Sequence, residues 1–350
     1  MKTSMLKGMN PPPASTSAFH KRLHAWYAAH GRTTLPWRTT ADPYRIYVSE
    51  VMLQQTRVET VRERYYGPFL KRFPTLSALA AAKREDVLKA WQGMGYYSRA
   101  ANLHKAAQAA APRLPDSVEG LLALPGVGRN TAQAVAAFAY REAVPVMEAN
   151  VKRVLHRMFA LTKANENALW EKAEALLDRA NPFDYNQAMM DLGSMVCTRR
   201  NPRCGACPAS SICKGKAKPE AYPAPKAKKK TPVRKRTIVL QRDVKGRIYA
   251  QPRTERFLHG MYRFTELEGK PPGGTHYLGH ITQAYSHFTL EAEVYLLDCP
   301  QPRLGLEAGW FTLAQFKKLP HSKAEEKILA LLEKNRRQGK SLQRISTAGS

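Results

Sequence analysis

The run CTRRNPRCGACPASSIC occupies residues 197–213 and holds four of the chain's five cysteines, separated by gaps of six, two and five residues. Short loops bring soft thiolate ligands together at little entropic cost, so Cys197, Cys204, Cys207 and Cys213 can close around one metal centre. Both a structural zinc site and a four-cysteine iron–sulfur cluster fit such a run. The spacing favours the iron–sulfur cluster, because zinc sites prefer two tight Cys-x-x-Cys pairs and this run has one. Five cysteines without a signal peptide indicate an intracellular protein, so we expect no disulfide.

The charge of the chain predicts a polyanionic partner. Its 350 residues include 56 Lys and Arg against 28 Asp and Glu, a formal net charge of +28. Lys and Arg bind nucleic acids by releasing the counterions condensed on phosphates. An anionic membrane is the competing partner, but no amphipathic helix rich in Trp or Phe and no long apolar stretch supports it. We therefore expect a nucleic acid partner, no membrane contact and a cytoplasmic location.

The first part of the chain is predicted to be all helical. Within residues 18–213, apolar side chains recur at helical spacing, and Phe19, Leu23, Trp26 and Tyr27 fall at i, i+4, i+7 and i+8. Short turns with Pro or Gly separate these segments. The pattern predicts one helical domain that ends at the cysteine run.

Composition changes sharply after the cysteine run. Residues 214–236 hold ten basic residues and one acid, which predicts a basic linker too polar to pack. Residues 237–336 change to a period of two and then to a final helix, so we expect a second, α+β domain. Residues 1–17 have no apolar core and are predicted to be a disordered leader, and 337–350 a disordered tail.

A glycine-bearing turn lies in the middle of the helical region. Leu124-Pro125-Gly126-Val127-Gly128 stands between two helical stretches. Two glycines two residues apart permit a tight hairpin whose N–H groups point outward at the next helix start, and this geometry binds phosphate without side chains. Most Gly-rich turns are only connectors, so phosphate binding and simple connection both stay open on this motif alone.

The hairpin and the cysteine run together resemble the helix–hairpin–helix DNA glycosylases that carry an iron–sulfur cluster. Further strings are similar to the MutY branch of that family, which removes adenine: LPWR (35–38), SEVMLQQT (49–56), GYYSR (95–99), NLH (102–104) and NQAMMDLG (186–193). The resemblance is close over residues 19–213 and loose beyond them. It implies an all-α helix–hairpin–helix glycosylase domain with a [4Fe-4S] cluster on the four cysteines, then a domain related in fold to Nudix hydrolases. It also implies DNA phosphate contacts at Gly126 and Gly128, with a monovalent cation at the hairpin, residues 125–128.

Glu50 is the candidate catalytic acid. Its neighbours Val51, Met52 and Leu53 are apolar, so its carboxyl is expected to be desolvated, which raises a carboxyl pKa and keeps an acid available near neutral pH. The alternative is an ordinary glutamate in the first turn of a helix, stabilised by the helix dipole. The resemblance implies that Glu50 protonates adenine so that the base can leave.

The second carboxylate departs from the family pattern, which has Asp-Gly-Asn where this chain has Glu148-Ala149-Asn150. The resemblance implies that Glu148 stabilises the oxocarbenium-like sugar and that Asn150 orients the site. The alternative for both is helix capping. Asn130 stands where relatives that cut the strand have a lysine nucleophile, so we expect hydrolysis of the base with the backbone left uncut.

Further residues take expected roles from the resemblance. Trp37 and Leu53 match positions that line the base pocket, and Gln187 matches one that reads the adenine edge. Gln55 and Tyr96 match residues that wedge into the duplex when a base is flipped. For Tyr96 a place in the apolar core is the alternative.

Residues Tyr285-Ser286-His287-Phe288 resemble the Phe-Ser-His motif by which the MutY branch senses 8-oxoguanine. The sequence therefore predicts a monomeric bacterial enzyme that removes adenine opposite 8-oxoguanine or guanine in double-stranded DNA. One alternative is a mismatch glycosylase of the same fold that acts on another base. The other is a lesion-binding relative with little or no catalysis, as the departures at Glu148 and Asn130 suggest.

Overall fold

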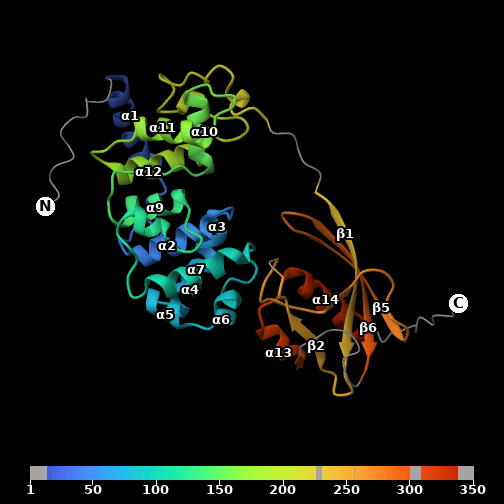
Figure 1. Cartoon of the computed structure of the whole chain (residues 1–350). Helices are drawn as coiled ribbons and strands as arrows, with labels where there is room; N and C mark the ends of the chain where they lie inside the picture. The colour runs from blue at the N-terminus through green and yellow to red at the C-terminus, as the bar shows by residue number, and fades with distance from the viewer. Residues whose placement is uncertain (1–13, 226–230, 256, 300–308, 338–350) are drawn as a thin grey trace. The chain divides into compact units, whose positions relative to one another are not determined.

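The computed structural model describes residues 14–225, 231–255, 257–299 and 309–337. These described residues form two compact units (Figure 1). The first unit falls within residues 1–70, 75–77 and 106–227, and the second within residues 71–74, 78–105 and 228–350.

The chain upstream of the basic run is helical, as the periodicity predicts (Figure 1). The α-helices are α1 (Ala14–His30), α2 (Pro43–Leu53), α3 (Val58–Thr60), α4 (Tyr66–Arg72), α5 (Leu76–Ala81), α6 (Arg84–Ala90), α7 (Tyr97–Ala110), α8 (Val118–Leu122), α9 (Arg129–Ala139), α10 (Ala149–Met158), α11 (Glu166–Leu176) and α12 (Pro182–Asp191). Shorter turns are the π-helical η1 (Val61–Tyr65) and η2 (Leu192–Val196) and the 3₁₀ turns η3 (Cys204–Ala206) and η4 (Pro219–Ala221).

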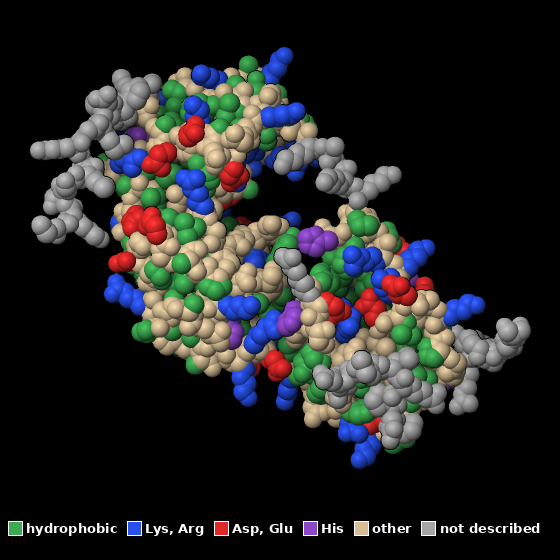
Figure 2. All heavy atoms as spheres, viewed as in Figure 1, with side chains coloured by type: hydrophobic (Ala, Val, Ile, Leu, Met, Phe, Trp, Pro, Cys, Tyr) green, Lys and Arg blue, Asp and Glu red, His purple; other side chains and the backbone are tan. Residues whose placement is uncertain are grey.

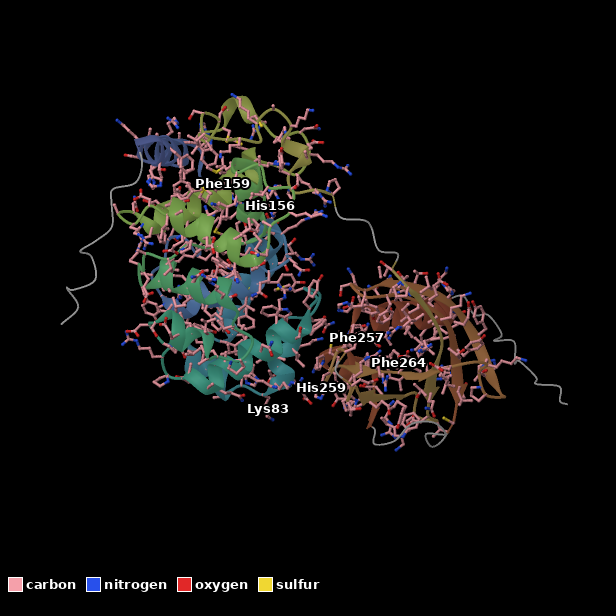
Figure 3. The ribbon with its side chains drawn as sticks, turned by 45° about the horizontal axis from the view of Figure 1, so that its top comes forward. Lys83, His156, Phe159, Phe257, His259 and Phe264 are labelled. Atoms are coloured by element: carbon pink, nitrogen blue, oxygen red, sulfur yellow. The ribbon has the colours of Figure 1, made fainter. Side chains whose placement is uncertain are left out.

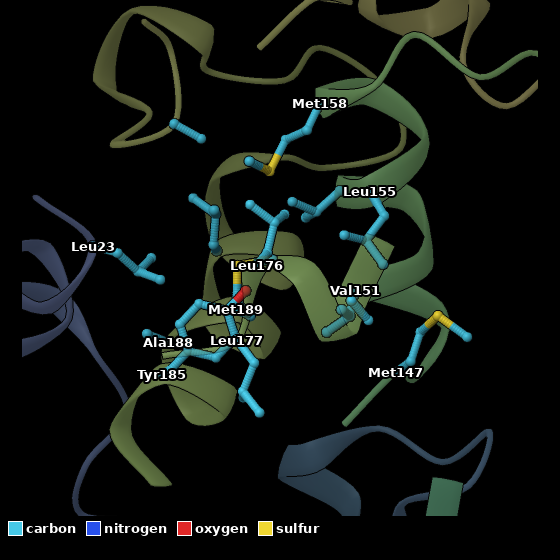
Figure 4. Close-up of a cluster of buried hydrophobic side chains, with 14 of the residues drawn as sticks. Leu23, Met147, Val151, Leu155, Met158, Leu176, Leu177, Tyr185, Ala188 and Met189 are labelled. Carbon is cyan, nitrogen blue, oxygen red and sulfur yellow. The ribbon is translucent and has the colours of Figure 1, made fainter. Parts of the chain in front are cut away.

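One apolar core joins α1, α10, α11 and α12 (Figure 4). In α10 the side chains of Val151, Val154, Leu155 and Met158 are buried at i, i+3, i+4 and i+7, so they line one face of the helix. Leu23 of α1 packs into the same cluster. Burial of a large aliphatic side chain stabilises a fold by roughly 1.5–3 kcal/mol. The buried face therefore holds α10 firmly against the neighbouring helices.

The second unit contains a mixed β-sheet with helices, so the α+β prediction is confirmed. Its elements are β1 (Val233–Arg242), β2 (Ile248–Pro252), β3 (Tyr262–Arg263), β4 (Thr265–Leu267), β5 (Thr275–Ala284), β6 (Thr289–Asp298), β7 (Gly309–Phe311), α13 (Leu313–Lys318) and α14 (Lys323–Arg337). The strand order is β3-β2-β1-β6-β5, with β4 paired to β1 and β7 to β2. Strands β1 and β6 run parallel, whereas β5 and β6 form an antiparallel hairpin.

Strand β6 follows the period of two that its sequence shows. Leu290, Ala292 and Val294 are buried and alternate with partly exposed residues. They join one apolar cluster with Ile328 and Leu329 of α14. The helix therefore covers the buried face of the sheet.

Several boundaries differ from the sequence prediction. Helix α1 begins at Ala14, inside the predicted leader, and β1 begins at Val233, inside the predicted linker. Pairing explains the second difference, because Val233 is in register with Thr289 of β6. Residues 78–105, predicted to belong to the helical domain, fall in the same unit as the sheet. The rest of the predicted leader, residues 226–230 of the predicted linker and residues 338–350 of the predicted tail lie outside the described residues.

No helix among the described residues is long and apolar enough to span a membrane. On the face shown in Figure 2, Lys and Arg side chains are spread over the surface with Asp and Glu between them. Basic side chains on this face are thus presented to solvent.

Candidate active site

Glu50 lies near the end of α2, and the start of that helix is set by Asp42. The Asp42 side chain accepts a hydrogen bond from the N–H of Tyr44 at 2.9 Å, and Pro43 takes the first helical position. Glu50 is therefore in the last turn, not the first. A helix dipole favours a carboxylate only near the N-terminus, so the dipole alternative for Glu50 is wrong.

The environment of Glu50 favours its protonated form. The residue keeps some exposed surface, but protein atoms surround its carboxyl group. Burial, and then the negative charge of Glu148, raise the pKa of Glu50 to about 7, against an opposing effect of Arg38. The predicted desolvation is confirmed, and Glu148 is close enough to contribute. A carboxyl with this pKa can donate a proton near neutral pH.

Glu148 caps α10. Its side chain accepts a hydrogen bond from the N–H of Val151 at 3.3 Å and another from Nδ2 of Asn150 at 3.2 Å. Burial raises the pKa of Glu148, while the hydrogen bonds from Asn150 and Val151 act in the opposite direction. The capping role is therefore real. It does not exclude a catalytic one, since the cap holds the carboxylate beside Glu50.

Asn130, in the first turn of α9, supports the backbone just before Glu148. Its Oδ1 accepts a hydrogen bond from the N–H of Met147 at 2.8 Å. The family resemblance placed Asn130 where strand-cutting relatives have a lysine nucleophile. In this structure the side-chain oxygen of Asn130 binds the main chain at Met147. The NH₂ of its side-chain amide is then its other polar group.

Asn150 links Glu148 to Arg153. The guanidinium of Arg153 donates to Oδ1 of Asn150 at 2.8 Å and to the carbonyl of Gly193 at 2.6 Å. Gly193 lies so close to Asn150 that a Cβ on it would stand 2.6 Å from the Cβ of Asn150. This contact needs glycine, because real Cβ atoms do not approach so closely.

Arg153 and Arg157 connect this network to the cysteine run. Both guanidiniums donate to the carbonyl of Cys197, at 2.8 Å and 3.2 Å. Arg157 also lies 3.3 Å from the Cys197 sulfur and donates to the carbonyl of Thr198 at 2.7 Å. The side chains of Arg153 and Arg157 therefore both reach the first cysteine of the run.

The four cysteines line one hollow. Cys197, Cys204, Cys207 and Cys213 lie around it with Arg157 beside them. Among the described residues no three His, Cys, Asp or Glu side chains are arranged to hold a metal ion. Four thiols on one hollow, next to a cation that offsets thiolate charge, nevertheless match the donor set of an iron–sulfur cluster.

The hairpin of residues 124–128 joins α8 to α9. The N–H of Val127 donates to the carbonyl of Leu124 at 3.2 Å, and Gly126 has a left-handed φ of 75°. Gly128 is the N-cap of α9, and nothing lies within 4 Å of where its Cβ would stand. The backbone at the start of α9 is thus open to a close ligand, as a phosphate or cation site would need. Occupancy by either stays a prediction.

Residues 48–179 match the model of a family described as "HhH-GPD superfamily base excision DNA repair protein". This part of the chain is similar to the HhH-GPD family. Glu50, Asn130, Glu148 and Asn150 all lie inside the matched range. The geometry described above therefore belongs to the matched domain itself.

The chain is also similar to proteins named adenine DNA glycosylase. It is 40% identical over 227 residues to the human protein, covering 59% of this chain and 41% of that one. It is 37% identical over 207 residues to the protein of Buchnera aphidicola subsp. Baizongia pistaciae, covering 57% and 59%. The chain thus spans less than two thirds of the length of these curated relatives.

Two solved structures support the fold of the HhH-GPD domain and its surroundings. A thermostable thymine-DNA glycosylase is 29% identical, with a TM-score of 0.54, and the match covers 58% of this chain and 97% of that one. An endonuclease III in a non-covalent DNA complex is 18% identical, with a TM-score of 0.51, over 60% of this chain and 98% of that one. Because the second match is only 18% identical, it supports the fold and not the function.

The residues expected to line a base pocket differ in exposure. Trp37 is buried, with its ring edge-on to Tyr66 at 5.2 Å between centroids. Gln187 on α12 is also buried, and Leu53 at the end of α2 is partly exposed. Leu53 shares the last turn of α2 with Glu50. The roles of these three residues stay predictions.

Gln55 and Tyr96 each have the geometry of a projecting side chain. Gln55 follows α2 in an exposed turn of the first unit, with a φ of 56°. Tyr96 precedes α7 in the second unit, with a φ of 49° and 42% of its surface exposed. The core alternative for Tyr96 is therefore wrong. Arg99 lies over the Tyr96 ring at 5.3 Å and donates to the carbonyl of Gly95 at 3.3 Å, which supports this turn.

The Tyr-Ser-His motif forms the turn between β5 and β6, where the N–H of Tyr285 donates to the carbonyl of Phe288. Ser286 and His287 are exposed at this turn. The Tyr285 ring instead packs edge-on against Phe257, labelled in Figure 3, and its hydroxyl lies 3.1 Å from the Ser322 hydroxyl. Intercalation by Tyr285 would require the ring to leave these contacts. Ser286 and His287 are therefore the residues of this motif that we expect to contact a base.

Sequence reasoning missed Asp191 and Arg38 as functional neighbours. Asp191 is fully buried, and Arg38 donates to its two carboxylate oxygens at 2.7 Å and 2.9 Å. Arg38 in turn lowers the pKa of Glu50. The signal was present, since both residues lie in the quoted strings LPWR and NQAMMDLG. A charge pair 153 residues apart in the chain, however, cannot be seen from spacing.

The proximity of the two carboxyl groups can be tested without any substrate. Glu148→Gln removes the charge that helps to raise the Glu50 pKa, so we expect the Glu50 pKa to fall below its value of about 7. Carboxyl ¹³C NMR titration measures this. Glu166→Gln, which removes an exposed charge paired with Lys152, is the matched control and should leave the Glu50 titration unchanged. A Glu50 titration that Glu148→Gln does not move would contradict the proximity.

Proposed function

We propose that the protein is a DNA glycosylase that removes adenine paired with 8-oxoguanine or guanine. The observation that carries the proposal is the pair formed by Glu50, whose pKa is raised to about 7, and the capped carboxylate of Glu148. This pair lies within the HhH-GPD domain, and the chain is similar to proteins named adenine DNA glycosylase. The net charge of +28 supplies the attraction to DNA phosphates.

The geometry supports a dissociative hydrolysis. Adenine is flipped out of the duplex, and Glu50 protonates its N7, so the base leaves with the electron pair of the N-glycosidic bond. The sugar becomes oxocarbenium-like, and the Glu148 carboxylate stabilises its positive charge. Water then adds at C1′ and loses a proton, which yields free adenine and an abasic site. Asn150, bonded to Glu148, keeps the carboxylate oriented.

Asn130 supports a monofunctional reaction. An amide cannot form a Schiff base with the sugar, and in this structure its oxygen is engaged with the N–H of Met147. The DNA strand should therefore remain intact at the abasic site.

A second candidate function is removal of thymine from a mismatch. It is favoured by the 29% identity to a structure described as a thymine-DNA glycosylase, 97% of which the match covers. Against it stands Gln187, a buried amide on α12, whose donor and acceptor suit an adenine edge. A non-catalytic lesion-binding protein is the third outcome of the experiment below.

Single-turnover cleavage of duplexes with A:8-oxoguanine, A:G or T:G distinguishes these functions. We expect adenine release, an abasic strand cut only after alkali or heat, and near-complete loss of release in Glu50→Gln with DNA binding retained. Because Glu50 acts in its protonated form, the rate should fall as pH rises through about 7. It should also fall at acidic pH, because Glu148, whose pKa is raised by burial, then loses the charge that stabilises the sugar. Release from T:G alone would replace the proposal with the second function. Binding without release would reduce the protein to a lesion binder.

We also propose a [4Fe-4S] cluster on Cys197, Cys204, Cys207 and Cys213. The four thiols share one hollow, and the Arg157 guanidinium beside Cys197 offsets their charge. When bound, the cluster would hold residues 197–213 in one conformation. The basic side chains of this loop, Arg199, Arg200 and Arg203, would then be presented to phosphate.

Purified protein should be brown and contain about four irons per chain. Cys204→Ser should lower the iron content and weaken DNA binding more than it lowers the cleavage rate of bound substrate. Cys299→Ser is the matched control, since Cys299 is buried directly after β6 and lies outside the hollow. A colourless protein with one zinc per chain would show that the site is a zinc site instead.

The sheet-bearing part is proposed to be a Nudix-related domain that reads 8-oxoguanine. Ser286 and His287 support this role, because they are exposed and polar at the turn between β5 and β6. The protein would act as a monomer on DNA in the bacterial cytoplasm, with the glycine hairpin at 125–128 on phosphate and a monovalent cation. Gln55 and Tyr96 would fill the space left by the flipped base.

The double variant Ser286→Ala with His287→Ala tests lesion reading. One or two lost base-edge hydrogen bonds are worth roughly 1–3 kcal/mol, so the preference for 8-oxoguanine over guanine should fall by about one or two decades. Cleavage of A:G should change little. Thr282→Ala with Gln283→Ala, which removes neighbouring polar groups on β5, is the control. Unchanged discrimination in the first variant would exclude this turn as the lesion sensor.

A further inference from the structure

Residues 144–147, the segment that leads into Glu148, lie outside helices and strands. Such a segment has no repeating backbone hydrogen bonds of its own, so other groups must hold it. Asn186 of α12 does so with both ends of its amide. Its Oδ1 accepts from the N–H of Val146 at 2.8 Å, and its Nδ2 donates to the carbonyl of Val144 at 2.9 Å.

The two bonds from Asn186 have the pattern of a strand edge. An N–H and a C=O two residues apart point to the same side of an extended chain, and one amide can pair with both. Only one orientation of the amide satisfies both bonds. Asn186 is 1% exposed, so bulk water does not compete with its amide for these two backbone groups.

Packing sets the same segment against both carboxylate-bearing elements. Val146 is buried in a cluster with Ile46 of α2, which lies one helical turn before Glu50. Met147 is buried in the core below α10, where Figure 4 shows it beside Val151. Residues 144–147 thus pack against both the helix that carries Glu50 and the helix that Glu148 caps. The two hydrogen bonds from Asn186 hold the backbone of this segment in place.

We propose that Asn186 is a positioning residue that sets the place of Glu148 relative to Glu50. The proposal rests on the glycosylase function proposed above. Asn186 touches neither carboxylate and acts through Val146, Met147 and the cap of α10. Because Gln187 is the next residue on α12, one turn of that helix would hold both the segment behind Glu148 and the group expected to read adenine.

The test replaces the amide without adding charge. In Asn186→Ala, Val144 and Val146 lose their partners and the segment moves. A displacement of about 1 Å can cost on the order of a hundredfold in rate, so the single-turnover rate should fall by about tenfold to a hundredfold. Affinity for a duplex with an uncleavable adenine analogue should change less than about threefold.

A pH profile separates positioning from loss of fold. The charged groups that act on Glu50 are Glu148, which raises its pKa, and Arg38, which lowers it. If Glu148 is displaced, the Glu50 pKa falls and the alkaline limb of the rate moves to lower pH. A loss of folded protein lowers the rate at every pH and leaves the midpoint in place. Thermal unfolding of each variant gives its folded fraction.

Asn181→Ala is the matched control. Asn181 stands at the N-cap position of the same helix without a side-chain capping bond, is exposed, and donates to Asp184. Its loss should therefore leave the rate and the midpoint of the pH profile unchanged. A parent-like rate and midpoint in Asn186→Ala would overturn the proposal, as would a lower rate with an unmoved midpoint. If the parent protein released no base, the proposed function would fail. NMR titration of Glu50 would still test the positioning, with a lower Glu50 pKa expected in Asn186→Ala.

Discussion

The arrangement of the site depends on one buried carboxylate, that of Asp191. Arg38 binds both of its oxygens, and Arg32 donates to them from its backbone N–H and its side chain. Two guanidiniums on one carboxylate offset the desolvation cost that a single buried pair often cannot. The contact ties the end of α12 to the turn after α1. Helix α12 also carries Asn186 and Gln187. It is therefore held in place both by the carboxylate of Asp191 and by the side-chain amide of Asn186.

That ion pair also tunes the acid. Arg38 lowers the pKa of Glu50, while burial and Glu148 raise it, and the balance lies at about 7. An unscreened guanidinium would favour the ionised form of Glu50 more strongly. Because Asp191 neutralises much of the Arg38 charge, Glu50 stays protonated near neutral pH, where the proposed reaction needs an acid. The Arg38–Asp191 ion pair therefore both holds α12 in place and sets the pKa of Glu50.

Short sequence patterns correctly predicted those features that depend on neighbouring residues in the chain. The apolar neighbours of Glu50 correctly indicated a desolvated carboxyl, and the alternation in residues 288–296 indicated strand β6. The helix position of Glu50 was misjudged in the dipole alternative, although Asp42-Pro43 is a readable start signal eight residues upstream. Asn186 could not be found this way. Its partners are backbone groups about 40 residues away, and no residue type marks a carbonyl that needs a donor.

The contact of Gly193 with Asn150 has a consequence for inherited variation. Any side chain at Gly193 would push against the side chain and the main-chain carbonyl of Asn150, the residue that orients Glu148. A substitution at this glycine would thus resemble an active-site lesion while leaving every proposed substrate-contacting residue unchanged. Under the proposed repair function, an allele with such a substitution would raise the mutation rate without altering a residue expected to contact DNA.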